Sequence, residues 1–420
     1  MSSTEIRALA EAARAASRAL ASATGEQKNA ALQAMSAGLL AGEGGILCAN
    51  RDDVAGAREA GNTAAFVDRL TLTPPRIQTM AAGLRQIADL PDPVGEVTGM
   101  WRRPNGLQVG RMRVPLGVIG FIYESRPNVT ADAAGLCLKS GNAVILRGGA
   151  EALRSNLAIG EVLARAVAAA GLPPAALSVV GTPDRAKVKE LLALHALIDL
   201  IIPRGGEEFI QMVRESSQIP VIAHDKGLCH TYVDQSADLG MAAAIALNAK
   251  VERPGVCNAM ETLLVHTEVA PALLPDLVAQ LARAGVEVRG CPETRVLVPS
   301  VRPATDADWD TEYLGLTLSV RVVPSFEEAL AHIARHGSGL AEAIVTSDYG
   351  RAMRFLREVD AGAVFVNAST RFTDGFEFGM GAEMGISTQK LHARGPMGLR
   401  ELTCEKFIVL GDGHVRHSQT

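Results

Sequence analysis

The chain lacks the features of metal proteins, disulfide-stabilised proteins and nucleic-acid-binding proteins. Its 420 residues include six cysteines, and none of these forms a CxxC pair or has the spacing of metal ligands. Scattered cysteines in a long chain indicate reduced thiols, so we expect a cytoplasmic protein. With 4% aromatic residues and a formal charge of −5, the sequence gives no reason to expect a nucleic-acid partner. No metal is predicted.

Long apolar runs are also missing. The sequence contains no stretch of about 18 consecutive apolar residues, and no charged segment followed by an apolar one opens it, so no membrane association is expected. It has no internal repeats or low-complexity segments. Hydrophobic residues make up 48%, which indicates large cores built from Ala, Val, Leu and Ile. The length predicts roughly two or three domains.

The chain does contain short apolar segments that alternate with helix-length amphipathic ones. Strands are predicted at 118–123, 143–147, 177–181 and 198–202, with 220–223 and 231–233 as possible extensions of this group. After a helix over 237–250, further strands are predicted at 262–266, 286–289, 295–298, 319–323, 343–346 and 363–366. This succession is typical of parallel sheets with right-handed crossovers. Such sheets bind ligands beyond the carboxyl ends of their strands.

Residues 95–114 interrupt this pattern. The Asn105-Gly106 turn lies between short polar-apolar alternations and predicts a β-hairpin. The hairpin is either an arm that reaches another subunit or a surface feature of its own domain. Near the end of the chain, 406–410 predicts one more strand.

Cys257 follows a Pro254-Gly255 turn, between a helix that ends near Lys250 and the strand at 262–266. A loop between rigid elements can hold a thiol in place and leave it accessible. The alternative is that Cys257 is a small buried apolar residue, as most free cysteines are.

Three segments at strand ends carry further candidate groups. Asn128 follows a strand and begins a helix, so its amide either donates to an oxyanion or caps that helix. Arg147 precedes Gly148 and Gly149, a combination suited to a ribose or its 2′-phosphate. Residues 203–206, Pro-Arg-Gly-Gly, precede a helix and suit a phosphate. None of these is a G-x-G-x-x-G motif, and glycine pairs are more often turns.

Two sets of segments resemble a known family. The first set follows the order of landmarks in the aldehyde dehydrogenase superfamily: 115–122, 141–147, the segment around Cys257, 312–314 and 362–367. The second set comprises 124–129, 367–374 and 387–399. Within the superfamily, these three are most similar to the reductases that act on the γ-carboxyl phosphate of glutamate.

The resemblance implies an α/β, aldehyde dehydrogenase-like fold with two parallel-sheet domains and a small β oligomerisation arm. Residues 1–98 and 114–235 would bind NADP(H), and 236–385 would form the catalytic domain. Residues 99–113 and 386–420 would form the arm and the C-terminal strand. These would join subunits into a homodimer or homotetramer.

The resemblance also assigns roles to individual residues. Cys257 corresponds to the nucleophile, and Asn128 to the amide that binds the oxyanion together with the backbone N–H of Cys257. Arg371 is our candidate for the substrate α-carboxylate, with a surface salt bridge as the alternative. The residues expected to contact the cofactor are Arg147, Gly148, Gly149, Pro203, Arg204, Gly205, Gly206 and Glu312.

The implied reaction is the NADPH-dependent reduction of glutamyl phosphate to glutamate 5-semialdehyde in proline biosynthesis, through a thioester on Cys257. Association with glutamate 5-kinase, which makes the unstable substrate, is possible. Two departures from the pattern stand out. The run 224–227, His-Asp-Lys-Gly, stands where oxidising members carry a Glu-Leu-Gly-Gly motif, so His224 occupies the place of the glutamate that activates water. Leu340-Ala341 stands where His-Thr is expected.

Three other functions remain open at this stage: an oxidising aldehyde dehydrogenase, a thiol hydrolase or acyltransferase that uses Cys257 with a histidine, and an inactive oligomeric scaffold.

Overall fold

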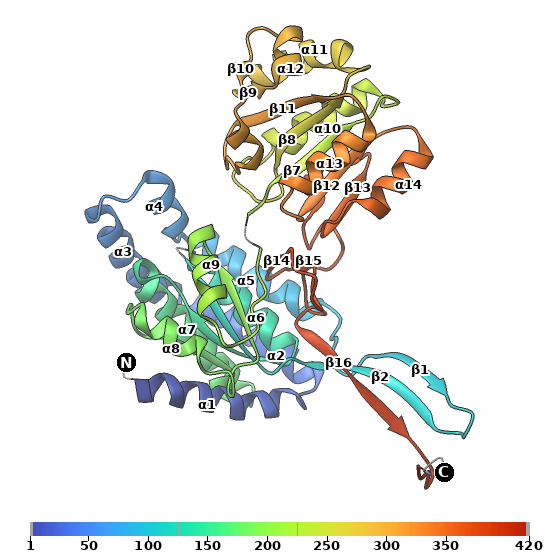
Figure 1. Ribbon diagram of the computed structural model, residues 1–420. Coiled ribbons are helices and arrows are strands. Elements are labelled where there is room, and N and C mark those ends of the chain that lie inside the picture. Colours follow the sequence, from blue (N-terminus) through green and yellow to red (C-terminus); the bar gives the residue numbers. More distant parts are fainter. Residues whose placement is uncertain (1–2, 125, 225, 417–420) are drawn as a thin grey trace. The chain divides into compact units, whose positions relative to one another are not determined.

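The structure is a computed structural model that describes residues 3–124, 126–224 and 226–416 (Figure 1). It divides into two compact units. The first unit extends to Ala223 and also includes 380–385 and the segment from Met397 onward, and the second comprises His224–Gly379 and Ile386–Pro396. The units therefore divide at residue 223, whereas the resemblance implied a boundary at 235.

The first unit is built on a four-stranded parallel sheet with the order β5-β4-β3-β6. Its strands are β3 (Val118–Tyr123), β4 (Ala143–Arg147), β5 (Leu177–Val179) and β6 (Leu200–Arg204). Every residue of β3 and β4 is buried, which explains why both are continuous apolar runs. The four predicted strands of this region are therefore confirmed. β3 and β4 have the predicted bounds, and the ends of β5 and β6 that differ do so by two residues. Val221, in the possible extension at 220–223, forms a parallel bridge with Ile201 of β6.

Helices surround this sheet. They are α1 (Ser3–Leu20), α2 (Gly25–Ala41), α3 (Glu43–Glu59), α4 (Ala64–Leu70), α5 (Pro74–Asp89), α6 (Asn128–Lys139), α7 (Leu153–Ala169), α8 (Ala186–Leu192) and α9 (Glu207–Ser216), with 3₁₀ turns η1 (Ala150–Ala152) and η2 (Pro174–Ala176). Among the described residues no single helix is long and apolar enough to cross a membrane, although the bent pair α2 and α3 passes that test of length and composition together.

The second unit contains a seven-stranded parallel sheet with the order β10-β9-β11-β8-β7-β12-β13. Its strands are β7 (Cys229–Val233), β8 (Met260–His266), β9 (Glu287–Gly290), β10 (Arg302–Pro303), β11 (Thr317–Val323), β12 (Ala341–Val345) and β13 (Ala363–Val366). Its helices are α10 (Leu239–Val251), α11 (Ala270–Arg283), α12 (Pro292–Leu297), α13 (Phe326–His336) and α14 (Tyr349–Glu358), with 3₁₀ turns η3 (Asp306–Asp310) and η4 (Thr370–Phe372).

Two apolar cores hold this sheet between layers of helices. Side chains of α10 and α11 pack with Leu263 and Val265 of β8. Side chains of α13 and α14 pack with Tyr232, Leu264 and Ile344. Since successive residues of a strand point to opposite faces, these sets identify the two faces of one sheet.

Two strand predictions were wrong. The segment 231–233 belongs to β7, which pairs with β8 and β12 in the second sheet and does not extend the first. The segment 295–298 lies largely in helix α12. Cys291 begins that helix in an extended conformation and Pro292 takes a first-turn position, where proline favours a helix. Val296 is 79% exposed, so its β-branched side chain packs in no sheet.

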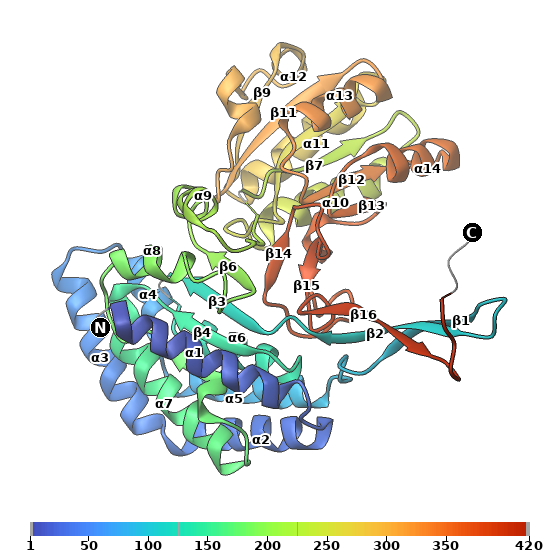
Figure 2. The ribbon, with the colours of Figure 1, turned by 60° about the horizontal axis from the view of Figure 1, so that its bottom comes forward.

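The hairpin and the C-terminal strand form a third sheet (Figure 2). It consists of β1 (Val97–Arg102), β2 (Gln108–Pro115) and β16 (Thr403–Leu410), all antiparallel. The rings of Trp101 and Phe407 meet edge to face at 6.5 Å, and several apolar side chains of this sheet are exposed. Two further short strands, β14 (Gly385–Ser387) and β15 (Gly395–Met397), pair with each other.

The core on the α11 face generates a first prediction. Leu277 of α11 has no exposed surface, so Leu277→Ala leaves a cavity and should lower the free energy of unfolding by about 2–5 kcal/mol. Leu277→Met nearly conserves volume and should cost less than about 1.5 kcal/mol. Denaturant unfolding of the two variants checks this, and equal effects would show that the site collapses around the smaller side chain.

Candidate active site

Cys257 lies in the loop that leads from α10 into β8, and it is half-buried. A loop from a helix into a parallel strand lies at the amino edge of the sheet. The thiol is therefore at the edge opposite to the one where open parallel sheets usually bind ligands.

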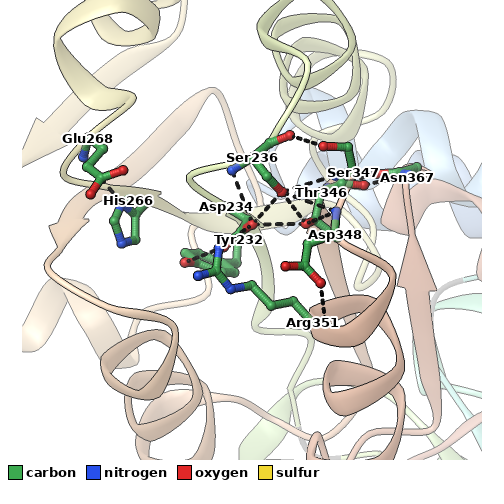
Figure 3. A network of polar contacts seen from close by, with 10 residues as sticks. All are labelled: Tyr232, Asp234, Ser236, His266, Glu268, Thr346, Ser347, Asp348, Arg351 and Asn367. Carbon is green, nitrogen blue, oxygen red and sulfur yellow. Dashed lines mark hydrogen bonds and ion pairs between the residues drawn. The ribbon is translucent and has the colours of Figure 1, made fainter.

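A network of polar side chains occupies the carboxyl edge of the second sheet (Figure 3). Asp234, which has no exposed surface, accepts hydrogen bonds from Ser236 Oγ at 2.8 Å, Thr346 Oγ1 at 2.9 Å and Arg351 Nη1 at 3.0 Å. Burial raises the pKa of Asp234, but these donors outweigh burial and hold it below its usual range. Asn367 also bonds to the backbone N–H and C=O of Thr346. The network thus joins the ends of β7, β12 and β13.

Gly227 and Cys229 position the backbone of Cys257. A Cβ on Gly227 would lie 2.1 Å from the carbonyl oxygen of Cys257 and 2.4 Å from its Cα, so only glycine permits this approach. The Cys229 Sγ donates to the same carbonyl oxygen at 3.3 Å. Burial raises the pKa of Cys229 well above its usual value, which keeps this group a thiol and a donor.

The surroundings of Cys257 are largely apolar. It packs against a cluster that includes Cys229, Leu340, Ala341 and Ile386. Leu340 and Ala341 have no exposed surface, so the pair that departs from the family pattern forms part of the apolar cluster beside Cys257.

Asn258 ties the Cys257 loop to the loop that follows β13. Its Nδ2 donates to the carbonyl oxygen of Thr373 at 2.8 Å, and its own carbonyl oxygen accepts from Thr370 Oγ1 at 2.8 Å. The guanidinium of Arg371 bonds to the Asn258 side-chain oxygen, and its Nε lies 2.6 Å from Glu252 Oε2. The salt bridge considered as the alternative role for Arg371 is therefore present. Arg371 also contacts Asn258, the residue that follows Cys257.

His224 also lies in the second unit. Its Nδ1 is 3.2 Å from the carbonyl oxygen of Ile386. Because a carbonyl only accepts hydrogen bonds, Nδ1 is the donor in this contact. Ser125 and Asp225, which belong to two of the sequence motifs, lie outside the described residues.

Glu312 lies in the loop between η3 and β11 and is half-buried. The next residue, Tyr313, donates its hydroxyl to Asp308 Oδ1 at 2.8 Å. Together with a salt bridge from Arg289 Nη1 to the same oxygen at 2.6 Å, this contact fixes the base of the loop.

In the first unit, Asn128 is the first residue of α6, directly after β3. The helix cap is Pro127, so the alternative of an Asn128 cap is wrong. Asn128 Nδ2 instead donates to Asp132 Oδ2 at 3.2 Å. Burial raises the pKa of Asp132 to about 6, and the hydrogen bond from Asn128 opposes that shift. The amide is thus oriented by the next turn of its own helix.

Arg147 ends β4 and is 8% exposed. One Nη donates to the carbonyl oxygen of Pro183 at 3.2 Å, while the buried Nε has no hydrogen-bond partner among the described residues. Burial lowers the pKa of Arg147 and the charge of Glu151 opposes this shift. An unpaired buried donor is costly in free energy, so the site fits an anion such as a ribose 2′-phosphate.

The glycines after Arg147 have a packing role. A Cβ on Gly148 would lie 2.0 Å from Asn156 Nδ2, and one on Gly149 would lie 2.1 Å from Glu151 Oε1. Because neither glycine has a Cβ, the side chains of Asn156 and Glu151 can lie close to the backbone at these two positions.

Residues 203–206 end β6 and lead into α9. The N–H of Gly206, the residue that caps α9, donates to Glu124 Oε2 at 3.2 Å, and the first turn contains Glu207 and Glu208. A carboxylate therefore holds the position where a phosphate would be expected. Arg204 pairs with Tyr123 in the neighbouring strand. Since β4, β3 and β6 are adjacent, Arg147, Asn128 and Arg204 share the carboxyl edge of the first sheet.

Within the described parts of the chain, no group of three or more His, Cys, Asp or Glu side chains is placed to hold a metal ion.

Comparison with known proteins identifies the class. The model of the aldehyde dehydrogenase family matches residues 1–296 and 296–406. The chain therefore belongs to the aldehyde dehydrogenase family. An acetylating aldehyde dehydrogenase from Geobacillus thermoglucosidasius shares this fold, with a TM-score of 0.69 at 18% identity, over 99% of this chain and 98% of that one. The expected fold class is confirmed.

Closer relatives place the chain within that family. It is 55% identical to the gamma-glutamyl phosphate reductase of Thermoanaerobacter pseudethanolicus, over 98% of this chain and 100% of the relative. With the same enzyme of Moorella thermoacetica it shares 57% identity, over 98% and 99%. The crystal structure of gamma-glutamyl phosphate reductase from Thermotoga maritima matches with a TM-score of 0.97 at 48% identity, over 98% and 100%. The chain thus belongs with the gamma-glutamyl phosphate reductases, which are oxidoreductases.

The contact between Gly227 and Cys257 generates a second prediction. Gly227→Ala should displace the Cys257 loop. It should lower kcat/KM about 100-fold, because small misplacements of reacting groups have effects of that size. The rate at which iodoacetamide alkylates Cys257 should change with it. Gly56→Ala is the control, since a Cβ on Gly56 in α3 meets nothing within 4 Å. Wild-type kinetics in Gly227→Ala would contradict the positioning role.

Proposed function

We propose that the chain catalyses the NADPH-dependent reduction of L-glutamate 5-phosphate to L-glutamate 5-semialdehyde, with release of phosphate, in proline biosynthesis. The observation that carries this proposal is the half-buried thiol of Cys257, held between Gly227 and Asn258, in a chain so similar to gamma-glutamyl phosphate reductases. The NADP-dependent reaction in reverse, assayed with glutamate 5-semialdehyde and phosphate, tests it directly.

In the proposed acylation step, the Cys257 thiolate attacks the γ-carbonyl carbon and the C–O bond to phosphate breaks. The negative charge that develops on the carbonyl oxygen needs donors that are already in place. We assign this role to the backbone N–H of Cys257 and to the amide of Asn128, which Asp132 orients. Phosphate is a good leaving group, so the step needs little general-acid catalysis.

NADPH, when bound, supplies the hydride that reduces the thioester. We assign the 2′-phosphate to Arg147, which has an unpaired buried Nε, and the nicotinamide ribose to Glu312. Gly148 and Gly149 keep the neighbourhood of Arg147 compact. For 203–206 to bind the pyrophosphate of the cofactor, the hydrogen bond from the N–H of Gly206 to Glu124 must first break.

His224 explains why the thioester on Cys257 is reduced by hydride rather than hydrolysed by water. Oxidising members of the family carry a glutamate at this place, and a carboxylate base activates water. In His224 the Nδ1 proton is engaged by Ile386, and the imidazole brings no carboxylate to the thioester. We infer that the acyl-enzyme persists until hydride or phosphate reacts with it.

We also propose that the third sheet joins subunits into a homodimer or homotetramer. Its apolar side chains Trp101, Phe407, Val409 and Leu410 are 40–62% exposed, and exposed apolar patches of this kind mark protein interfaces. Association with glutamate 5-kinase and a cytoplasmic location are further parts of the proposal.

Cys257→Ala should abolish turnover, with residual activity below about one part in a thousand, because removal of a nucleophile has effects of that size. NADPH binding, followed by fluorescence titration, should be unchanged because the thiol is not part of the cofactor site. Higher residual activity would point to another nucleophile.

Arg147→Ala should weaken NADPH binding about 10–100-fold, because charge-assisted hydrogen bonds to the 2′-phosphate are lost. NADH has a hydroxyl at that position and should lose far less affinity. Dissociation constants for both cofactors, measured on the wild type and the variant, check this, and equal losses would rule out the assignment.

Arg371→Ala should raise KM for glutamate 5-semialdehyde about 10-fold or more if the guanidinium binds the α-carboxylate. Glu252→Gln is the matched control, because it breaks the salt bridge and retains Arg371. A rise in KM only in Arg371→Ala supports the substrate role. The same rise in both variants would show that only the salt bridge matters.

A further inference from the structure

An ion pair with no exposed surface joins the two ends of the Cys257 loop. Lys250 lies in the last turn of α10 and Glu261 is the second residue of β8. Lys250 Nζ lies 2.5 Å from Glu261 Oε2, and both side chains are 0% exposed. Burial lowers the pKa of Lys250 and raises that of Glu261, and each charge opposes the shift of the other. The pair closes the base of the loop that carries the nucleophile.

Stability alone does not explain a charged pair at this place. Removing two charges from water costs more free energy than their attraction usually returns, and apolar residues of similar volume often serve stability as well or better. Ion pairs and hydrogen bonds are directional, unlike apolar contacts, so they determine which atoms meet. A role in positioning the Cys257 loop therefore explains the buried pair better than stability does.

The same carboxylate reaches a second loop. Glu261 Oε1 accepts a hydrogen bond from the backbone N–H of Leu314 at 3.3 Å. Leu314 has a φ of +52°, a left-handed conformation that is uncommon for residues other than glycine and that needs support from its surroundings. The carbonyl oxygen of Leu314 lies beside the Cys257 loop, since a Cβ on Gly255 would be 3.7 Å from it.

Lys250 contacts this second loop from its own side. Its Nζ lies 5.8 Å from the centre of the Tyr313 ring, within the range of a cation–π interaction. Tyr313 is held at its other end by Asp308, as described above. The pair thus contacts both residues that directly follow Glu312.

We propose that Glu261 is a positioning residue which, together with Lys250, fixes the Cys257 loop and the Glu312 loop in one arrangement. This role rests on the proposed function in one respect, the assignment of Glu312 to the nicotinamide ribose. It sets the spacing between the thiol that holds the acyl group and the residue that holds the hydride donor. Because reacting atoms must approach within about 3.5 Å, a shift of either loop lowers the rate of the chemical step.

Two variants separate position from stability. Glu261→Gln retains the shape of the side chain and removes its charge, and Lys250→Met with Glu261→Met replaces the pair by apolar side chains of similar length. The control is Lys28→Met in the first unit, because Lys28 is equally buried and lies 2.5 Å from Asp92. For each protein we would measure the unfolding temperature, kcat, KM and the rate of Cys257 alkylation by iodoacetamide, with and without NADP.

The double variant should retain the wild-type unfolding temperature and lose about 10–100-fold in kcat, with little change in KM for the semialdehyde. We expect NADP to change the alkylation rate of the wild type, and this change should be lost in the double variant. Glu261→Gln should lose kcat too. Lys28→Met should unfold at a lower temperature and keep the wild-type kcat.

Wild-type kcat and alkylation in both Glu261 variants would overturn the proposal, as would a loss of kcat in Lys28→Met as large as theirs. Failure of the proposed function gives a different result: the wild type would then show no phosphate-dependent reduction of NADP. In that case the alkylation rates without cofactor still decide whether the pair holds the Cys257 loop.

Discussion

The active site depends on a backbone contact that leaves no room for a side chain. Gly227 packs so closely on Cys257 that a Cβ would lie 2.1 Å from the carbonyl oxygen of Cys257. The thiol of Cys229 binds that same oxygen, and Asn258 binds the loop that follows β13. Gly227 and Cys229 contact the backbone of Cys257, and Asn258 is the residue that follows Cys257. The thiol is therefore held in place without any of these groups having to contact the substrate.

The thiol of Cys257 lies at the amino edge of the second sheet, which is the less usual edge for a ligand site. The carboxyl edge of the second sheet is taken up by the network around Asp234, which joins three strand ends (Figure 3). The amino edge carries the loop between α10 and β8, closed by Lys250 and Glu261. In the first sheet the arrangement is reversed, and Asn128 and Arg147 lie at the carboxyl edge. The candidate residues therefore lie at the carboxyl edge of one sheet and the amino edge of the other.

Much of the fold could be predicted from the sequence because both parallel sheets are buried on both faces, which makes their strands continuous apolar runs. The partner of a strand is not encoded locally, so β7 was assigned to the wrong sheet. The apolar segment 295–298 was taken for a strand because the helix-starting effect of Pro292 was overlooked. Cys257, Asn128 and Arg147 were predicted as site residues from their places at the ends of elements and from the family resemblance, and their roles stay predictions. Gly227 was noted only as part of a motif, since the need for a glycine depends on a residue 30 positions away.

If Cys257 forms a thioester that phosphate releases, the dependence of NADP reduction on phosphate concentration tests this step directly. Wild-type enzyme with glutamate 5-semialdehyde and NADP, but without phosphate, should give a burst of about one NADPH per active site and then almost stop. Added phosphate should restore steady turnover. Steady turnover to free glutamate without phosphate would contradict the account, because it would show that a base near Cys257 delivers water to the thioester.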